Sequence, residues 1–330
     1  MRAVKRTGSG VEVVECAEPT AGPSEQLVRV ATAGICGSDL HMVAMGPSPA
    51  TLGHEIAART ADGRLVAVRP TGACRTCRFC AAGRIHLCSD ALGRFFGGAI
   101  DGGMADRLVI DADRLVEVPD SMKPSTVALV EPIAVAVHGV RRVPLVDGQR
   151  VAVIGAGSVG LAVVAALRGL RRRSWSHSGV DVSVEIDVEA RHPHQAGAAE
   201  RLGANLGLSG RYDVVFDAVG TQSAVDRAIR VCDNGGTVVE LGIFWESVSL
   251  AAEFTFREIG LAPAVLYAEG GHSGGGDDDF RSAVSILGAD PEITSTMVTH
   301  RFPLTDAVEA FRVASDRSSG SLKVQLVVEE

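Results

Sequence analysis

The feature that most constrains this chain is a six-residue loop, Gly155–Gly160, with the sequence Gly-Ala-Gly-Ser-Val-Gly. The loop follows the apolar run Val151–Ile154, which predicts a buried strand, and it precedes a helical pattern that ends near Leu170. Glycines at this spacing between a strand and a helix are typical of a dinucleotide-binding βαβ unit. The chain is therefore predicted to contain a parallel sheet with a phosphate-binding loop.

Each glycine of this loop has a separate physical task. Gly155 allows the tight turn, Gly157 lets the backbone approach a pyrophosphate, and Gly160 permits close packing of the helix. The N-terminus of the helix also favours negative charge, because its first N–H groups point toward the ligand. We therefore expect the phosphates of a dinucleotide to lie against Gly155, Gly157, Ser158, Val159 and Gly160.

Strand and helix patterns alternate from residue 151 onward. Tyr212–Phe216 and Gly236–Leu241 predict further strands with helices between them, which indicates a doubly wound parallel sheet over residues 142–292. The first 141 residues differ, because they consist mainly of short β-rich runs bounded by Gly, Pro and Asp. These runs are Val11–Val14, Leu27–Val30, Leu65–Val68 and Arg107–Ile110.

Several shorter segments connect or complete these two parts. Ala61–Arg64 predicts a tight hairpin turn, and Ser125–Arg141 is apolar at helical intervals and predicts a helix that leads out of the first domain. Gly270–Asp279 is rich in Gly and Asp and predicts a surface loop. Near the C-terminus, Val308–Ala314 predicts a helix, and the alternating run Leu322–Val328 predicts a strand that rejoins the first domain.

The composition excludes several classes of partner. The formal charge of −8 argues against nucleic acid, because phosphate binding needs clustered Lys and Arg. The longest uncharged stretch, Val151–Leu167, is shorter than the roughly 18–20 residues that a membrane span needs. The first ten residues lack the apolar segment of a secretion signal. We therefore expect a cytoplasmic protein without a membrane or nucleic-acid partner.

Four cysteines predict a structural zinc site in a lobe at about residues 72–90. They form a C-x2-C-x2-C-x7-C run, and four thiolates at short spacing can surround a tetrahedral ion completely. A redox-active C-x-x-C pair is the alternative, but four thiols committed together favour the metal. The ligands are Cys74, Cys77, Cys80 and Cys88.

A second, open zinc site is predicted from residues on either side of the first strands. A catalytic zinc needs three protein ligands and one vacant position. Cys36 and His54 supply a thiolate and an imidazole, and Glu55 and Glu131 are both candidates for the third ligand. Taken alone, Glu131 is better explained as a helix-start charge that the helix dipole favours.

The order of these motifs resembles the zinc-dependent medium-chain alcohol dehydrogenases, in particular the branch of polyol and threonine dehydrogenases. The resemblance covers nearly the whole chain. It implies a GroES-like β-rich catalytic domain, residues 1–141 and 293–330, and a Rossmann domain, residues 142–292. The motifs that carry it are Gly34–His41, Gly53–Glu55, the four-cysteine run, Asp101–Gly103, Val130–Pro132, the glycine loop and Leu202–Ala204.

The resemblance also implies roles for the residues of the open site. Cys36 and His54 match the catalytic zinc ligands, Glu131 matches the third ligand of the polyol-type branch, and Glu55 matches a neighbouring glutamate that can approach the metal. Two zinc ions per chain, one catalytic and one structural, are expected. Related enzymes form dimers or tetramers, so a homodimer or homotetramer is expected by analogy.

A proton relay follows from the same resemblance. Ser38 matches the residue that touches the substrate oxygen, His41 matches the outer member of the relay, and Asp39 would orient His54. Zinc would lower the pKa of a bound alcohol, whose proton would leave through Ser38, the nicotinamide ribose and His41. The expected reaction is hydride transfer between a secondary alcohol or polyol and NAD(P).

The choice between NAD and NADP depends on where the second strand of the parallel sheet ends. An acidic residue that holds the ribose usually follows the glycine loop by about 20 residues. Leu202–Ala204 is a landmark of the family that the chain resembles. Counted back from it, the strand ends at Glu189–Arg191, which implies an insertion of about ten residues near 170–183. In this register Ala190 replaces the acid and Arg191 follows, which favours the 2′-phosphate of NADP.

Alternatives remain at the level of the sequence. A different register would end the second strand at Asp181 and keep an NAD-type acid, and Asp187 and Glu189 are further acidic candidates. The segments between His41 and Gly53 and between His54 and Cys74 are short for the family, so the substrate is not transferable by analogy. A zinc-free quinone or enone reductase on the same fold, or a non-enzymatic relative disabled by the insertion, are competing interpretations.

Overall fold

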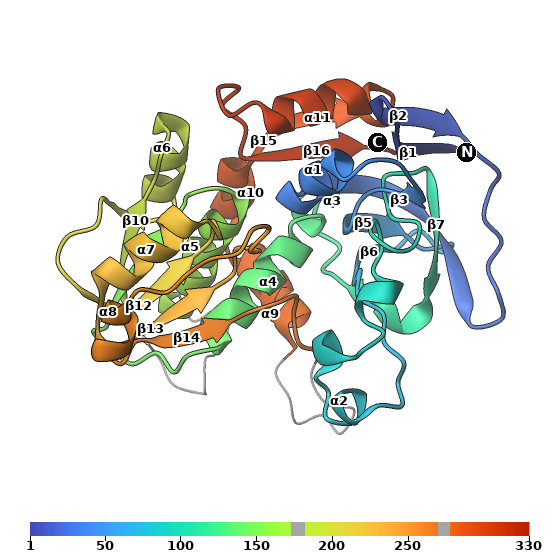
Figure 1. The fold of residues 1–330 in the computed structure, drawn as a ribbon. Helices are drawn as coiled ribbons and strands as arrows, with labels where there is room; N and C mark the ends of the chain where they lie inside the picture. The colour runs from blue at the N-terminus through green and yellow to red at the C-terminus, as the bar shows by residue number, and fades with distance from the viewer. Residues whose placement is uncertain (173–181, 270–277, 330) are drawn as a thin grey trace. The chain divides into compact units, whose positions relative to one another are not determined.

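The computed structural model describes residues 1–172, 182–269 and 278–329, and the chain divides into two compact units (Figure 1). Unit 1 contains residues 1–131, 268–288 and 298–330, and unit 2 contains residues 132–267 and 289–297. The sequence places the boundaries near residues 141 and 293, whereas the contacts also assign residues 268–288 to unit 1.

Unit 1 is built on two β-sheets. The smaller sheet has the order β2-β1-β4, and the larger has the order β15-β16-β3-β5-β6-β8, with β7 also paired to β3. All of the short β-rich runs predicted in the first 141 residues lie in these sheets, as does the predicted C-terminal strand. The strands are β1 (Arg2–Thr7), β2 (Gly10–Glu15), β3 (Glu25–Ile35), β4 (Ser48–Thr51), β5 (Glu55–Arg59), β6 (Leu65–Val68), β7 (Arg107–Asp111), β8 (Leu115–Glu117), β15 (Val298–Pro303) and β16 (Lys323–Val327).

The helices of unit 1 are short, and most of them lie between strands. The hairpin turn predicted at 61–64 is present, because β5 and β6 pair antiparallel on either side of it. Single turns of 3-10 helix occur at Ile85–Leu87, Leu92–Arg94, Ala112–Arg114 and Leu304–Asp306. The α-helices are α1 (Gly37–Ala44), α2 (Arg78–Ala81), α3 (Pro124–Val127), α9 (Asp279–Ala289) and α11 (Ala307–Ser315).

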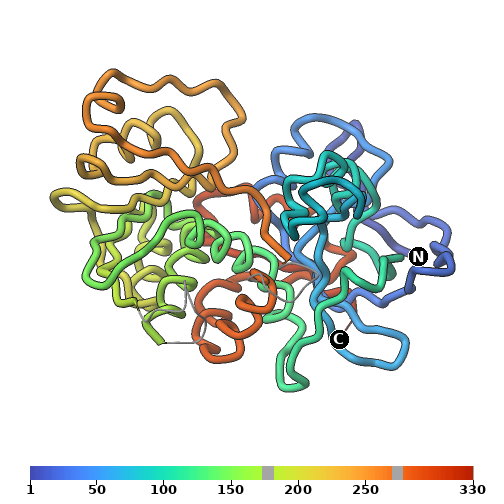
Figure 2. Tube along the Cα trace, turned by 90° about the horizontal axis from the view of Figure 1, so that it is seen from below, coloured from blue at the N-terminus to red at the C-terminus, as the bar shows by residue number. Residues whose placement is uncertain are grey.

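The C-terminal strand completes the core of unit 1, as the sequence predicts. Strand β16 pairs antiparallel with β3, so Val324 lies opposite Ile35, and the trace of Figure 2 shows the C-terminal chain returning among the N-terminal strands. Strand β16 lies inside the sheet between β15 and β3, α11 packs against it, and the Gln325 amide donates to the Ser125 carbonyl oxygen at 2.8 Å. Lys323 and Gln325 are therefore fully buried, although the alternating pattern would place them in solvent.

Unit 2 is a doubly wound sheet of six parallel strands in the order β11-β10-β9-β12-β13-β14. The chain starts in the middle at β9 and proceeds outward on both sides, which is the order of a dinucleotide-binding fold. The elements are α4 (Val130–Arg141), β9 (Arg150–Ile154), α5 (Ser158–Arg171), β10 (Glu185–Glu189), α6 (Pro193–Arg201), β11 (Asn205–Leu206), β12 (Tyr212–Asp217), α7 (Gln222–Val231), β13 (Cys232–Glu240), α8 (Ala252–Phe256), β14 (Gly260–Pro263) and α10 (Pro291–Met297).

Two of the sequence predictions need correction. The helix predicted over Ser125–Arg141 is two helices, α3 and α4, because the chain leaves the helical path at Ala128–Leu129. Pro132 lacks an N–H group and therefore suits the first turn of a new helix better than the interior of a long one. The alternative register that ends the second strand at Asp181 is wrong, because β10 ends at Glu189.

Several predicted features fall outside the described residues. These are most of the insertion near 170–183, including Trp175, His177 and Asp181, and most of the loop predicted at 270–279. Among the residues that the structure does describe, no helix combines the length and the apolar composition required to cross a lipid bilayer.

Candidate metal and cofactor sites

Strands β3 and β5 bring two predicted metal ligands to one edge of the larger sheet of unit 1. The strands pair antiparallel with Gly34 opposite Glu55, so Cys36 and His54, just beyond the paired ends, face each other. The Cys36 sulfur, a His54 ring nitrogen and a Glu55 carboxylate oxygen lie within 4.8 Å of one another. This spacing and donor set fit three ligands around one zinc ion.

The backbone before His54 requires glycine. Gly53 has φ +98°, in the left-handed region, and a Cβ there would lie 2.9 Å from the backbone nitrogen of Met104. A side chain at this position would therefore be strained and would collide with the neighbouring segment. Gly53 thus lets the chain turn sharply so that His54 enters β5 facing Cys36.

Helix α1 orients the His54 ring. The Asp39 carboxylate accepts the Cys36 backbone N–H at 2.8 Å, and its other oxygen lies 3.5 Å from His54 Nδ1. Burial alone would lower the pKa of His54, but the nearby Asp39 and Cys36 raise it well above its ordinary value. A carboxylate on Nδ1 leaves Nε2 to face a metal, which is the usual arrangement of a zinc-bound histidine.

The two predicted relay residues lie on the same face of α1. Ser38 Oγ is 3.3 Å from His54 Nε2, so the hydroxyl borders the candidate metal site. His41 follows almost one turn later, is exposed, and has Nδ1 2.9 Å from the Gly37 carbonyl oxygen. With Nδ1–H donated to that carbonyl, Nε2 is the nitrogen that can take up a proton.

Glu55 is held by a buried lysine that the sequence analysis missed. Lys323 Nζ lies 2.5 Å from Glu55 Oε1 and donates to the Ile35 carbonyl at 3.2 Å, and both charged side chains are 1% exposed. A Cβ on Gly34 would lie 1.9 Å from Glu55 Oε2, so only glycine leaves room for this carboxylate. A charged residue inside an apolar strand is the signal that points to Lys323.

The second oxygen of Glu55 has no hydrogen-bond partner among the described residues. A buried carboxylate oxygen without a donor is costly, and a cation is one way to satisfy it. Together with the thiol of Cys36 and the imidazole of His54, this orphaned oxygen indicates that the residues present fit a zinc ion.

Glu131 is buried at the start of α4 but is not part of the 4.8 Å group. Burial raises the pKa of Glu131 to about 7, while the charge of His54 lowers it and the charge of Glu55 raises it. Glu131 therefore faces the same site as these two residues. The structure leaves both carboxylates, Glu55 and Glu131, as candidates for the third ligand.

The four lobe cysteines converge as a second group. Their sulfur atoms lie within 4.8 Å of one another, with Cys77 and Cys80 at 3.5 Å and Cys74 and Cys80 at 3.9 Å. The group sits in a small core with Ile85 and Ala91, which is too small to be stable alone. A metal ion therefore suits this lobe as a structural support.

Backbone N–H groups donate hydrogen bonds to sulfur atoms of the lobe, which favours the thiolate form that binds a cation. The N–H groups of Cys77 and Cys74 donate to the sulfurs of Cys74 and Cys88, both at 3.3 Å. The Thr76 hydroxyl and nearby N–H groups lower the pKa of Cys74 to about 6, whereas burial raises the pKa of Cys80 to about 12. Four thiolates so close together repel one another unless a divalent cation balances their charge, so this donor set fits zinc.

The glycine loop of unit 2 has the geometry that the sequence predicts. Gly155 has φ +88°, and a Cβ on Gly160 would lie 1.8 Å from the Gly155 carbonyl oxygen. A Cβ on Gly157 would meet nothing within 4 Å, so this side of the loop is open. Gly157 is the N-cap of α5 and brings no side-chain acceptor to the N–H groups of Ser158 and Val159, so the loop fits a phosphate.

The acidic residues near the end of β10 already form hydrogen bonds or ion pairs with other residues of the protein. Asp187 is buried and accepts hydrogen bonds from the Tyr212 hydroxyl and the Asn205 amide, and Glu189 pairs with Arg227 of α7 at 2.8 Å. Neither is therefore a ready ligand for a ribose. Beyond β10 follow Ala190, the exposed Arg191, and the stacked rings of His192 and His194 with centroids 5.5 Å apart.

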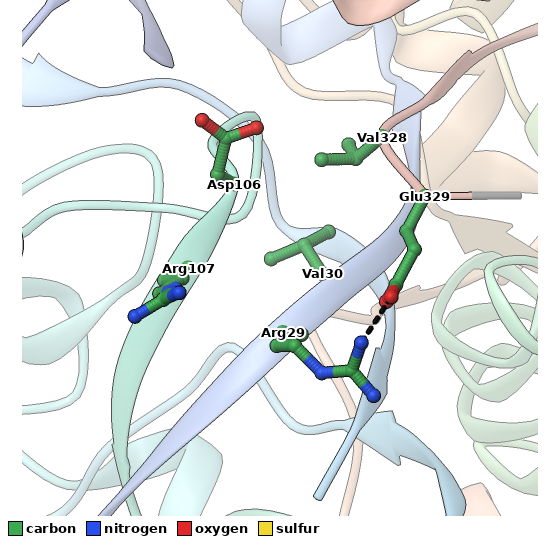
Figure 3. A pocket seen from close by; sticks show the side chains of 6 residues that line it. All are labelled: Arg29, Val30, Asp106, Arg107, Val328 and Glu329. Carbon is green, nitrogen blue, oxygen red and sulfur yellow. Dashed lines mark hydrogen bonds and ion pairs between the residues drawn. The ribbon is translucent and has the colours of Figure 1, made fainter. Parts of the chain in front are cut away.

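A further hollow of about 180 Å³ lies in unit 1 among Arg29, Val30, Asp106, Arg107, Val328 and Glu329 (Figure 3). Its two arginines are paired, Arg29 with Glu329 and Arg107 with Glu18. The hollow contains none of the residues of either metal group, and its charges are neutralised internally, so we assign no ligand to it.

Comparison with known proteins shows the family of this chain. Residues 22–120 match the alcohol dehydrogenase GroES-like domain, and residues 194–320 match the zinc-binding dehydrogenase family. The chain is 30% identical to L-galactonate-5-dehydrogenase of Escherichia coli (strain K12), covering 89% of this chain and 88% of that protein. It is also 30% identical to L-threonine 3-dehydrogenase of Saccharopolyspora erythraea, covering 95% and 96%.

A solved structure agrees with the fold. The protein of Sinorhizobium meliloti 1021, described as a zinc-binding dehydrogenase and solved with NADP bound, superposes with a TM-score of 0.81 and 26% identity, covering 99% of each chain. The present chain therefore belongs to the zinc-dependent alcohol dehydrogenase family. It is an oxidoreductase of the polyol dehydrogenase branch, which confirms the family, the fold class and the enzyme class predicted from sequence.

Proposed function

We propose that this protein oxidises a secondary alcohol or polyol, or reduces the matching carbonyl compound, with NADP as the preferred cofactor. The observation that carries the proposal is the cluster of Cys36, His54 and Glu55, with the Ser38 hydroxyl 3.3 Å from the His54 ring. A zinc ion bound there would act as a Lewis acid on the substrate oxygen. The relatives named L-galactonate and L-threonine dehydrogenases support a hydroxylated small molecule as substrate.

The residues around the site have separate tasks in this proposal. Ser38 Oγ accepts the hydroxyl proton of the substrate and releases its own proton into a relay that ends at His41, which lies further along α1, is exposed, and exchanges the proton with solvent. Asp39 keeps the His54 ring in one orientation. Phe95, whose ring centroid lies 5.1 Å from that of His54, provides an apolar wall that keeps water from the reacting carbon.

We assign the third catalytic ligand to Glu131 and keep Glu55 as the carboxylate beside it. Glu55 forms an ion pair with Lys323 at 2.5 Å, whereas Glu131 is buried with a raised pKa and forms no ion pair among the described residues. Zinc analysis of Glu131→Ala and Glu55→Ala tests the assignment. Loss of one zinc ion in the first variant and retention in the second is the expected result, and the reverse would exchange the two roles.

The cofactor preference rests on the end of β10. Ala190 offers no carboxylate to a ribose, and the exposed Arg191 follows directly, so a 2′-phosphate has a cationic partner there. The NADP bound in the Sinorhizobium meliloti structure is consistent with this preference. Titration by cofactor fluorescence should show NADPH binding more tightly than NADH, and Arg191→Ala should weaken NADPH about tenfold and leave NADH nearly unchanged.

The activity test uses zinc-replete protein with a panel of polyols, sugar acids and β-hydroxy amino acids, and follows NADPH absorbance. Turnover of at least one class, lost on chelation and restored by zinc, is the expected result. Turnover of quinones or enones that survives complete metal removal would instead establish the zinc-free reductase.

We also propose that the protein works as a homodimer or homotetramer in the cytoplasm. Strand β14 is the edge of the six-stranded sheet, and its Leu261 and the nearby Val265 are exposed apolar side chains. An exposed apolar edge strand offers unpaired backbone groups that another chain can pair with. Light scattering after gel filtration should give an oligomer, and Leu261→Lys should shift it toward the monomer. None of the seven cysteines forms a disulfide, which suits a reducing compartment.

A further inference from the structure

Two buried carboxyl groups lie side by side at the carboxyl edge of the parallel sheet in unit 2. Asp217 is the last residue of β12, Glu240 is the last residue of β13, and the two are partners in the strand register. Asp217 is 0% exposed and Glu240 is 5% exposed. The two groups are therefore forced together in an environment where two negative charges are costly.

The hydrogen bonds around the pair are asymmetric. One oxygen of Asp217 accepts the backbone N–H of Val219 at 2.8 Å and that of Gly220 at 3.2 Å, which stabilises Asp217 as the charged form. The other oxygen of Asp217 and both oxygens of Glu240 are buried without a partner among the described residues. A single proton on Glu240, donated to Asp217, would satisfy this arrangement.

Asp217 holds a turn that touches the cofactor loop. The turn 218–220 packs so closely that a Cβ on Gly155 would lie 2.4 Å from Val219, and a Cβ on Gly220 would lie 2.7 Å from Gly242. The backbone of the turn after β13 is also tied to Asp217, because Gly242 N–H donates to its carbonyl oxygen at 3.1 Å. A shift of the carboxyl pair would therefore move the wall of the glycine loop.

The turn after Asp217 lies where its displacement would affect a bound dinucleotide. In the order β11-β10-β9-β12-β13-β14, successive strands are added on one side of β9 as far as β11 and on the other side from β12 onward. Ligands of such sheets bind at the carboxyl ends of the strands where the strand order reverses, here between β9 and β12. The turn after Asp217 borders Gly155, the first glycine of the phosphate loop.

We propose that Glu240 is a positioning residue for cofactor binding: its carboxyl group carries a proton that it donates to Asp217, and loss of that proton weakens the binding of the dinucleotide. The inference rests on the proposed function only in that the glycine loop binds NAD(P). Loss of the proton would act in two ways. The two carboxylates would repel each other and displace the turn that Asp217 holds, and they would add negative charge near the phosphates.

The titration of Glu240 falls within an accessible range. Burial raises the pKa of Glu240 to about 9, the charge of Asp217 adds to this effect, and the Gly242 N–H opposes it. Burial also raises the pKa of Asp217, against the N–H groups of Val219 and Gly220. Among the described residues, no other charged group contributes to either shift, so the pair titrates as an isolated unit.

The sign of the stability effect follows from linkage. Between the ordinary pKa of 4.5 and about 9, the folded protein holds a proton on Glu240 that the unfolded chain has released. The contribution of Glu240 to stability is therefore complete below pH 4.5, falls as the pH rises toward 9, and is constant above that. Glu240→Gln removes this dependence, because its amide stays neutral and still donates to Asp217.

The first experiment is a fluorescence titration of NADPH and NADH with the full chain from about pH 7 to about pH 10. The Kd of the wild type should rise about tenfold over this range, equivalent to one pKa unit of coupling, whereas that of Glu240→Gln should stay within about twofold. Glu253→Gln, an exposed carboxylate of the same unit paired with Arg257, is the matched control and should follow the wild type. An equal rise in wild type and Glu240→Gln would overturn the proposal.

A second measurement does not depend on the cofactor or on the variant binding it. The infrared difference spectrum between the wild type and Glu240→Gln cancels the band of Glu131, whose pKa is about 7, and should show the carbonyl band of one protonated carboxyl group at about pH 8 that disappears above about pH 9. Absence of such a band from the difference spectrum would also overturn the proposal. Neither experiment requires turnover, so a protein that passes both and oxidises no alcohol would refute the proposed function alone.

Discussion

The two candidate zinc groups of unit 1 are built by different means. The lobe has four identical ligands from a segment of fifteen residues, Cys74 to Cys88, with backbone N–H groups donated to the sulfurs. The site at Cys36 and His54 combines a thiol, an imidazole and a carboxylate, and a buried lysine from the far end of the chain holds that carboxylate.

This difference shows that a closed site and an open site affect the free energy of folding in different ways. The lobe leaves no position for a substrate and uses the metal to stabilise a core that is too small to stand alone. The open site instead buries Asp39, His54, Glu55 and Lys323, whose charges must be balanced by one another and by the metal. The first should therefore matter for folding, and the second for chemistry and for the local charge balance.

The sharpest test of the comparison is Cys36→Ser. We expect the zinc content to fall from two ions to one per chain and kcat/KM to fall at least about a thousandfold, because the Lewis acid is lost. The melting temperature should change little. Cys16→Ser, a partly buried thiol outside both groups, is the control, and full turnover in Cys36→Ser would remove Cys36 from the site.

Cys80→Ser should have the opposite effect to Cys36→Ser, because it should mainly lower the stability of the protein. Loss of one buried lobe ligand should lower the free energy of unfolding by about 4 kcal/mol, a part of the roughly 10–16 kcal/mol that structural zinc supplies to small domains. The measurement is thermal unfolding with parallel zinc analysis. Cys232→Ser is the matched control for a buried thiol, and an unchanged melting temperature with two zinc ions retained would contradict a structural role for the lobe.

The variant Lys323→Met tests whether the stability of the protein depends on the buried cation beside Glu55. Removing the lysine leaves Glu55 charged and unpaired in the interior, which should cost about 3 kcal/mol of stability. Lys123→Met, on an exposed lysine, should cost almost nothing. Chemical denaturation at neutral pH measures both, and equal stability of the two variants would show that Glu55 does not need Lys323.

The smallest expected effect is that of Asp39→Asn. The amide keeps the shape of Asp39 but removes the charge beside His54 Nδ1, so the affinity for the catalytic zinc should fall about tenfold. Competition with a chelator should show one weakened and one unchanged zinc site. Asp120→Asn, at an exposed position, should leave both affinities unchanged.

Local patterns were sufficient for a large part of the molecule. The glycine loop, the strands β6, β9 and β12 and the end of β10 at Glu189 follow from spacing, β-propensity and the distance to a sequence landmark. The break between α3 and α4 was missed because both helices are apolar on the same period, and periodicity does not register a two-residue interruption.

The four-cysteine lobe and the phosphate loop can be predicted from the sequence, because their interacting residues are close neighbours along the chain. The two-part architecture can be predicted because the pattern changes from short β-rich runs to alternating strands and helices near residue 142. The tertiary structure was needed to find that Lys323 contacts Glu55, 268 residues away, and that Asp217 lies opposite Glu240. These contacts depend on which strands become neighbours and in which register. That choice is made by packing of the whole sheet, and no short segment of sequence contains it.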